Sequence, residues 1–130
     1  MGVFNFIKKF LAIIGAIIFL NCNICAAENL KFIDSNDDDG YFIDTDSIKI
    51  ENNSAFRVNM AIIRLNVNQM EIVDLRINHA AKIYEILSTR TVSYDERTEI
   101  KADNTRRGAK SYSEKSLMGD IVNIVIYGGE

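Results

Sequence analysis

The stretch AFRVNMAIIRLN, residues 55–66, decides the fold, because apolar and polar side chains alternate over its first half. Under the two-residue period of a strand, one face is wholly apolar and consists of Phe56, Val58, Met60 and Ile62. Arg57 and Asn59 point to the other face. This pattern predicts a β-strand with one face against a core.

The neighbouring segments repeat the strand pattern. Residues 70–79 alternate Val73, Leu75 and Ile77 with polar side chains, and residues 82–94 also favour a strand. Residues 97–102 predict a weaker edge strand, and the polar residues 103–113 predict a loop.

The segment before residue 55 predicts a hairpin. Residues 30–35 and 41–43 are short strands around the turn-forming residues 36–40, NDDDG. A second polar bend is expected at residues 44–47, followed by a strand at 48–51 and a turn at 51–54.

The C-terminal segment changes its period. Leu117, Ile121, Ile124 and Val125 are spaced as one stripe of an amphipathic helix, with Ser113 or Ser116 as its cap and Gly128 and Gly129 at its end. The β-branched residues 121–127 would also suit a strand. Periodicity favours the helix, and a sheet with one apolar face needs such a cover. The sequence therefore predicts an α+β fold, an antiparallel sheet with a C-terminal helix packed on one face.

Residues 1–27 predict a cleavable secretory signal peptide. Lys8 and Lys9 precede the apolar run of residues 10–20, which as a helix would span about 16 Å, too short for a bilayer. Cys25-Ala26-Ala27 places small residues before a cut at Glu28, the first acidic residue of the chain. The predicted domain is then residues 28–130, located in the periplasm or at the cell surface, with no membrane span after cleavage.

Two other roles for this leader remain open. An uncleaved leader would be a membrane anchor, and a lipid on Cys22 or Cys25 would also anchor the chain. These are the chain's two cysteines. Cleavage after Ala27 would leave a domain without a disulfide, which must be stabilised by its own core.

Charge limits the classes of partner. Lys8 and Lys9 are the only charged residues before Glu28, so the remainder has 13 Lys and Arg against 18 Asp and Glu, a formal charge of −5. This balance gives no reason to expect nucleic acid as a partner.

Residues 34–46 hold six aspartates, and their oxygens would suit Ca²⁺. The EF-hand register fails, because Asp39 stands where glycine is needed. A solvated hairpin turn is therefore favoured over a weak calcium site, and no metal or cofactor is predicted.

A catalytic site is not predicted either. His79 is the single histidine, and no nucleophile-elbow motif accompanies it. A small enzyme is kept only as the least favoured class.

A basic stretch is the one candidate binding site. Residues 97–115 carry a formal charge of +3, whereas residues 34–51 carry −6. Such polarity would steer an anionic partner, although an ordinary solvated loop would show it as well. The candidate residues for contact with a protein or glycan are Arg106, Arg107, Lys110 and Lys115.

Three segments resemble the surface-adhesin protein E-like domain family of exported bacterial envelope proteins. LKFIDSNDDDGYFIDTDSIKI (30–50) resembles its opening, AKIYEILSTRTVSYD (81–95) its middle strand and turn, and SEKSLMGDIVNIVIY (113–127) its closing helix. The chain departs from the family pattern at Leu30, where an aromatic residue is usual, and in lacking paired cysteines after Ala27.

The resemblance implies about six antiparallel strands, a C-terminal helix on one face, and no known catalytic site. It also implies an adhesin-like, non-enzymatic module that engages host matrix or other macromolecules. The alternative is a periplasmic structural or regulatory domain with no host contact.

Overall fold

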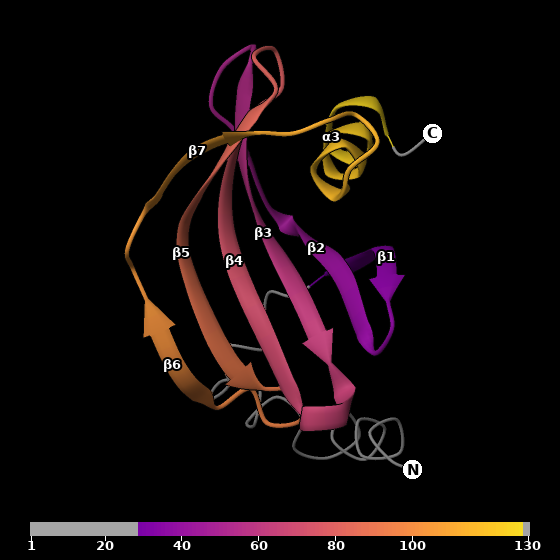
Figure 1. The fold of residues 1–130 in the computed structure, drawn as a ribbon, viewed down its shortest axis with the longest axis vertical. Coiled ribbons are helices and arrows are strands. Elements are labelled where there is room, and N and C mark those ends of the chain that lie inside the picture. The colour runs from indigo at the N-terminus through magenta and orange to yellow at the C-terminus, as the bar shows by residue number, and fades with distance from the viewer. Residues whose placement is uncertain (1–28, 129–130) are drawn as a thin grey trace, which may run out of the picture.

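The computed structural model describes residues 29–128, which form one antiparallel sheet and a C-terminal helix (Figure 1). The strands are β1 (Leu30–Asn36), β2 (Asp39–Ile50), β3 (Ala55–Arg64), β4 (Gln69–Asn78), β5 (Ile83–Ser93), β6 (Glu99–Asp103) and β7 (Arg107–Ser111). A short 3-10 turn, η2 (Leu65–Val67), joins β3 to β4, and the helix is α3 (Leu117–Tyr127). The predicted α+β class, with an antiparallel sheet and a C-terminal helix, is confirmed.

The strands follow one another across the sheet in the order β1-β2-β3-β4-β5-β6, and β7 also pairs with β5. β6 pairs with the second half of β5 from Thr89 to Val92, whereas β7 pairs with the first half from Ile83 to Ile86. The two short strands therefore lie end to end along β5.

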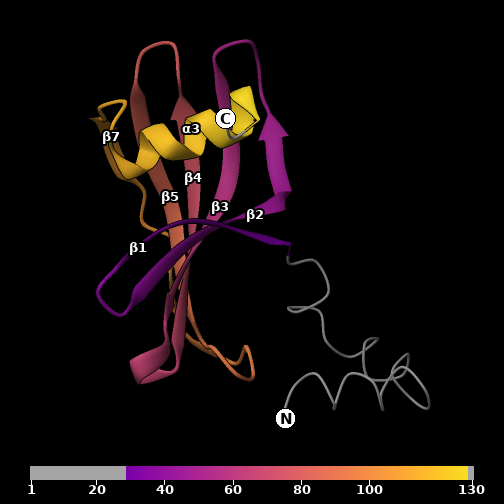
Figure 2. The same cartoon turned by 90° about the vertical axis from the view of Figure 1, so that its right-hand side faces the viewer.

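The central strand β3 presents its predicted apolar face to the core. Phe56 and Val58 are almost completely buried, and Met60 and Ile62 nearly so. In register with them, Leu75 and Ile77 of β4 are fully buried. Figure 2 shows α3 crossing this face of the sheet, so the helix covers the apolar surface that the strand pattern predicts.

The helix α3 begins after Ser116, whose side-chain oxygen accepts a hydrogen bond from the Gly119 amide at 3.3 Å. It ends at Gly128, which has a left-handed backbone (φ 79°) and whose amide donates to the carbonyls of Asn123 and Ile124. Ile121 is fully buried and Val122 nearly so, and both belong to the core formed with β3 and β4. Of the two predicted capping serines, the structure uses Ser116.

Two local predictions differ from the structure. Residues 44–47 do not separate two strands, because β2 runs through them with a shift in its register against β3 between Asp44 and Lys49. The Asp44 carboxylate accepts from the Asp46 amide and Ser47 donates to the Asp44 carbonyl, so these polar side chains stabilise the irregularity within the strand.

The prediction of a loop over residues 103–113 is wrong in its second half, where β7 forms. The sequence RGAKS has no apolar alternation that would predict a strand, and all five of its side chains are exposed in the structure. Backbone pairing with β5 holds it in the sheet.

The opposite face of the sheet has a smaller core at the end away from α3. Ala61 and Ile63 of β3 pack there with Met70 of β4 and Val92 of β5. The other end of this face, on the reverse side of the sheet from α3, carries charged side chains instead. The candidate binding surface lies at this charged end.

Candidate binding surface and cleft

The structure divides the predicted basic residues between two faces. Arg107 and Lys110 lie on β7, in register with Ile86 and Tyr84, whose side chains pack toward the core beneath α3. Arg106 instead contacts Glu85, which points to the face opposite α3. Lys115 lies in the turn before α3 and is exposed, like the other three.

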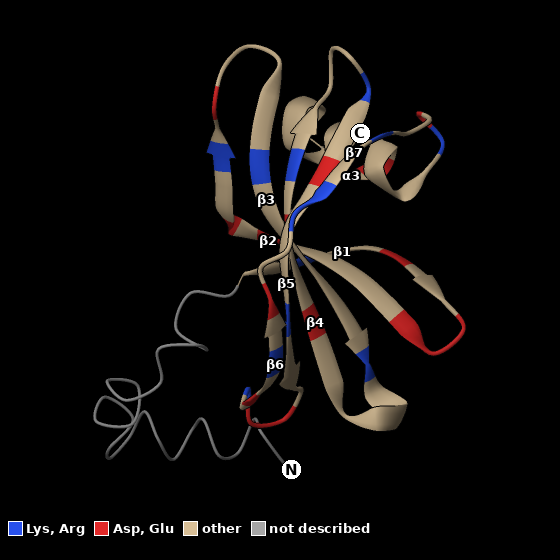
Figure 3. Cartoon of the chain, turned by 60° about the vertical axis from the view of Figure 1, so that its left-hand side comes forward, with Lys and Arg blue, Asp and Glu red and all other residues tan. Residues whose placement is uncertain are grey.

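Three further cations lie side by side on the face opposite α3, and we call Lys49, Arg57 and Arg76 the cation row. The register pairs Lys49 of β2 with Arg57 of β3, and Arg57 with Arg76 of β4. Figure 3 shows neighbouring blue bands on adjacent strands with a red band beside them, and the register places Glu85 of β5 opposite Arg76. Like charges directly opposite one another destabilise a sheet, so this arrangement needs compensation.

Carboxylates supply part of that compensation. Asp74 bonds Arg57 at 2.6 Å, and Glu51 accepts two hydrogen bonds from Arg76 at 2.9 and 3.0 Å. The hydrogen bond from Arg76 lowers the pKa of Glu51, and the same bond raises the pKa of Arg76. Both members of this pair therefore stay charged over a wide pH range.

Glu85 links the cation row to Arg106, one of the four predicted contact residues. Its carboxylate lies 3.1 Å from the Arg106 guanidinium and 4.0 Å from that of Arg76. The row and Arg106 together form the basic surface (Lys49, Arg57, Arg76 and Arg106), which has four cations against the three carboxylates of Glu51, Asp74 and Glu85. Lys49 is exposed and has no ion-pair partner among residues 29–128.

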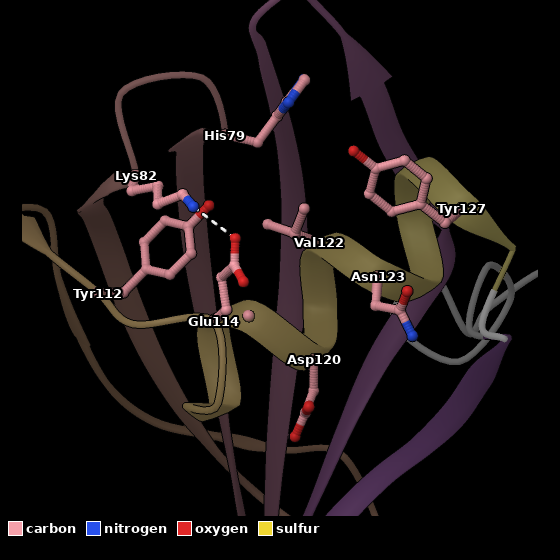
Figure 4. Close-up of a pocket in the computed structure, with 9 residues that line it drawn as sticks. His79, Lys82, Tyr112, Glu114, Asp120, Val122, Asn123 and Tyr127 are labelled. Carbon is pink, nitrogen blue, oxygen red and sulfur yellow. Dashed lines mark hydrogen bonds and ion pairs between the residues drawn. The ribbon is translucent and has the colours of Figure 1, made fainter.

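A cleft of about 400 Å³ opens beside α3, on the other face (Figure 4). Val122 and Gly119 of the helix lie at its base, and Tyr127 stands at the helix end. The opposite side carries Lys82, from the turn between β4 and β5, and Tyr112, from the segment that follows β7.

An ion pair holds one side of this cleft. The Lys82 ammonium lies 2.5 Å from the Glu114 carboxylate, and this bond joins the β4–β5 turn to the segment before α3. The hydrogen bond from Lys82 lowers the pKa of Glu114, and the reciprocal bond raises the pKa of Lys82. Burial raises the pKa of the Tyr112 hydroxyl, so this group stays protonated to a higher pH than an ordinary tyrosine.

The acidic hairpin has structural partners. Asp39 lies 3.4 Å from Arg64, and Asp44 accepts from the backbone amides of Asn29 and Asp46. Within residues 29–128, no group of three or more His, Cys, Asp or Glu side chains is arranged to hold a metal ion.

Searches against family models, curated proteins and solved structures return no match to this chain. The resemblance to the surface-adhesin protein E-like family therefore stays a prediction. The predicted leader and both cysteines lie outside the described residues. Among residues 29–128, no helix has the length and apolar character needed to cross a membrane.

Sequence reasoning missed the cation row because its members come from three separate strands. Lys49 follows an acidic segment, and Arg57 and Arg76 each occur singly in an alternating strand. The two-residue period places each arginine on the polar face of its strand, but only the register between strands brings them together.

Proposed function

We propose that this protein is an exported, non-enzymatic envelope module of adhesin-like type that binds an anionic macromolecule through its basic surface. The leader-like residues 1–27 support export, and the adhesin-like role rests on the resemblance of the remaining chain to the surface-adhesin protein E-like family.

The observation that carries the proposal is the cation row. Lys49, Arg57 and Arg76 face one another across three strands although like charges in register cost stability. Asp74 and Glu51 offset this cost at Arg57 and Arg76 but leave Lys49 without a carboxylate. Anionic groups of a partner would complete the compensation, which makes the row suited to an acidic protein or glycan.

The test replaces Lys49 and Arg106 together by Gln and measures binding to two probes, immobilised heparin and polyglutamate. We expect weaker binding in the double variant, with a smaller dependence on salt, because two exposed cations of the basic surface are removed. Unchanged binding of both probes would contradict the proposal.

Location decides between this function and the alternative of a periplasmic structural or regulatory domain. Protease added to intact cells should degrade the protein if the basic surface is displayed to external partners. Protection on intact cells, with degradation after the outer layer is permeabilised, would favour the periplasmic alternative.

A further inference from the structure

The cleft beside α3 lies on the face opposite the basic surface and has a different chemistry. Its lining combines two tyrosines, Tyr112 and Tyr127, with a mostly polar set of side chains that includes His79 and Asn123. At about 400 Å³, the cleft falls within the size range of small-molecule sites.

Charge excludes two classes of ligand. The charged residues that line the cleft are Lys82, Glu114 and Asp120, so an anion bound in it would meet two carboxylates against one ammonium. A cation would compete with Lys82 for Glu114, which Lys82 already bonds at 2.5 Å. The cleft therefore favours a neutral ligand.

Polarity excludes a wholly apolar ligand. Covering the Lys82–Glu114 pair and the Tyr112 hydroxyl with hydrocarbon would remove water from these groups and provide no hydrogen bonds in return. The ligand that fits has hydroxyl or amide groups on its edge.

Tyr127 and Val122 indicate the shape of ligand that the cleft favours. Tyr127 is 65% exposed, and Figure 4 shows its hydroxyl directed toward the cleft, with Val122 between Tyr127 and the ion pair. An exposed ring beside a small apolar base gains by contact with a flat ligand that has a C–H face. A ring with apolar C–H faces and a hydroxyl-bearing edge is a pyranose sugar.

We propose that the cleft formed by Tyr112, Val122, Tyr127 and the Lys82–Glu114 pair binds a neutral pyranose unit of a glycan. The sugar ring lies over Val122 beside Tyr127, and its hydroxyl groups hydrogen-bond with Glu114 and Tyr112. This site is separate from the basic surface, so either one can fail without the other.

The test is an NMR titration of the ¹⁵N-labelled protein with chitotriose in its N-acetylated form, maltotriose and lactose, each added separately. We expect at least one of them to give saturable shifts at the backbone amides of residues 81–82 and 114–123. Tyr127→Ala should weaken this binding by about three- to tenfold, which corresponds to the loss of one aromatic contact.

Two variants make the result specific. Tyr112→Phe keeps the ring but removes the hydroxyl, and we expect it to weaken the same saccharide while preserving the fold. Arg106→Gln, on the other face, should leave saccharide binding unchanged. The proposal is overturned if no saccharide gives saturable shifts, if the shifts lie away from the cleft, or if Tyr127→Ala and Tyr112→Phe both bind like the parent protein.

Discussion

Gly119 occupies a position that no larger residue fits. A Cβ built at this residue would lie 2.2 Å from the Glu114 carbonyl oxygen, which belongs to the backbone of the turn before α3. We expect Gly119→Ala to destabilise the fold by about 1–3 kcal/mol, because the backbone must shift to admit the methyl group. Urea unfolding measures this change.

Gly108 of β7 is the matched control for Gly119. A Cβ at Gly108 would meet nothing within 4 Å, so Gly108→Ala should change stability little. Equal stability of the two variants would show that the turn before α3 is not packed as the structure has it.

Ser116 stabilises the first turn of α3 through its side-chain oxygen. We expect Ser116→Ala to lower the free energy of unfolding by about 1 kcal/mol, the usual effect of losing an N-cap. Ser113 offers the control, because its backbone carbonyl, and not its side chain, accepts the bond from Ser116. If Ser113→Ala destabilises as much as Ser116→Ala, the cap is assigned to the wrong serine.

The stability that the Lys82–Glu114 pair contributes is expected to depend on pH. The pKa of Glu114 is lowered in the folded state by the bond from Lys82, so the contribution of this pair is present above the ordinary pKa of a glutamate. It is lost as the pH falls through the lowered folded value. We expect an NMR titration of the Glu114 carboxyl to show a midpoint below that of a free glutamate.

Lys82→Gln tests the cause of the Glu114 shift. Removing the ammonium should move the Glu114 midpoint back up toward its ordinary value, because the hydrogen bond from Lys82 is the largest cause of the shift. A midpoint that does not move in this variant would mean that another group holds the carboxylate.

At the scale of elements, α3 is attached to the sheet without a disulfide, since residues 29–128 contain no cysteine. Its attachment rests on Ile121 and Val122 in the core and on the Lys82–Glu114 pair at its start. The attachment of the helix therefore depends on apolar packing and on one ion pair.

Ile121→Ala should destabilise the protein by about 2–5 kcal/mol, because Ile121 is fully buried and its truncation leaves a cavity beneath the helix. Ile100 of β6 is 53% exposed and provides the control, since Ile100→Ala removes contacts mostly with water. Thermal unfolding of both variants measures the difference, and a similar melting temperature for the two would contradict this packing of α3.

The elements also show what a sequence can predict. α3 was predictable because its apolar stripe and caps are local features of residues 113–128. β7 was not, because a strand with five exposed side chains is specified by its partner β5 and not by its own pattern. The cation row was missed for a related reason, since register between strands depends on the whole sheet.

At the scale of the molecule, the two faces of the sheet differ at the end where α3 packs. The face that α3 covers is apolar, and the reverse face is charged there. Arg57 lies between Phe56 and Val58 in sequence, so the same strand supplies both the core and the basic surface. The fold thereby presents the cation row on a rigid support, which suits the binding of a large anionic partner.

The most direct test of this proposed function is the affinity for heparin of Lys49→Gln/Arg106→Gln, compared with Lys31→Gln/Lys101→Gln. Both double variants lose two exposed cations, but only the first loses them from the basic surface. We predict that the first binds heparin more weakly and with a smaller salt dependence, while the second retains the parent's affinity. Equal affinities for the two double variants would contradict the assignment of binding to this surface.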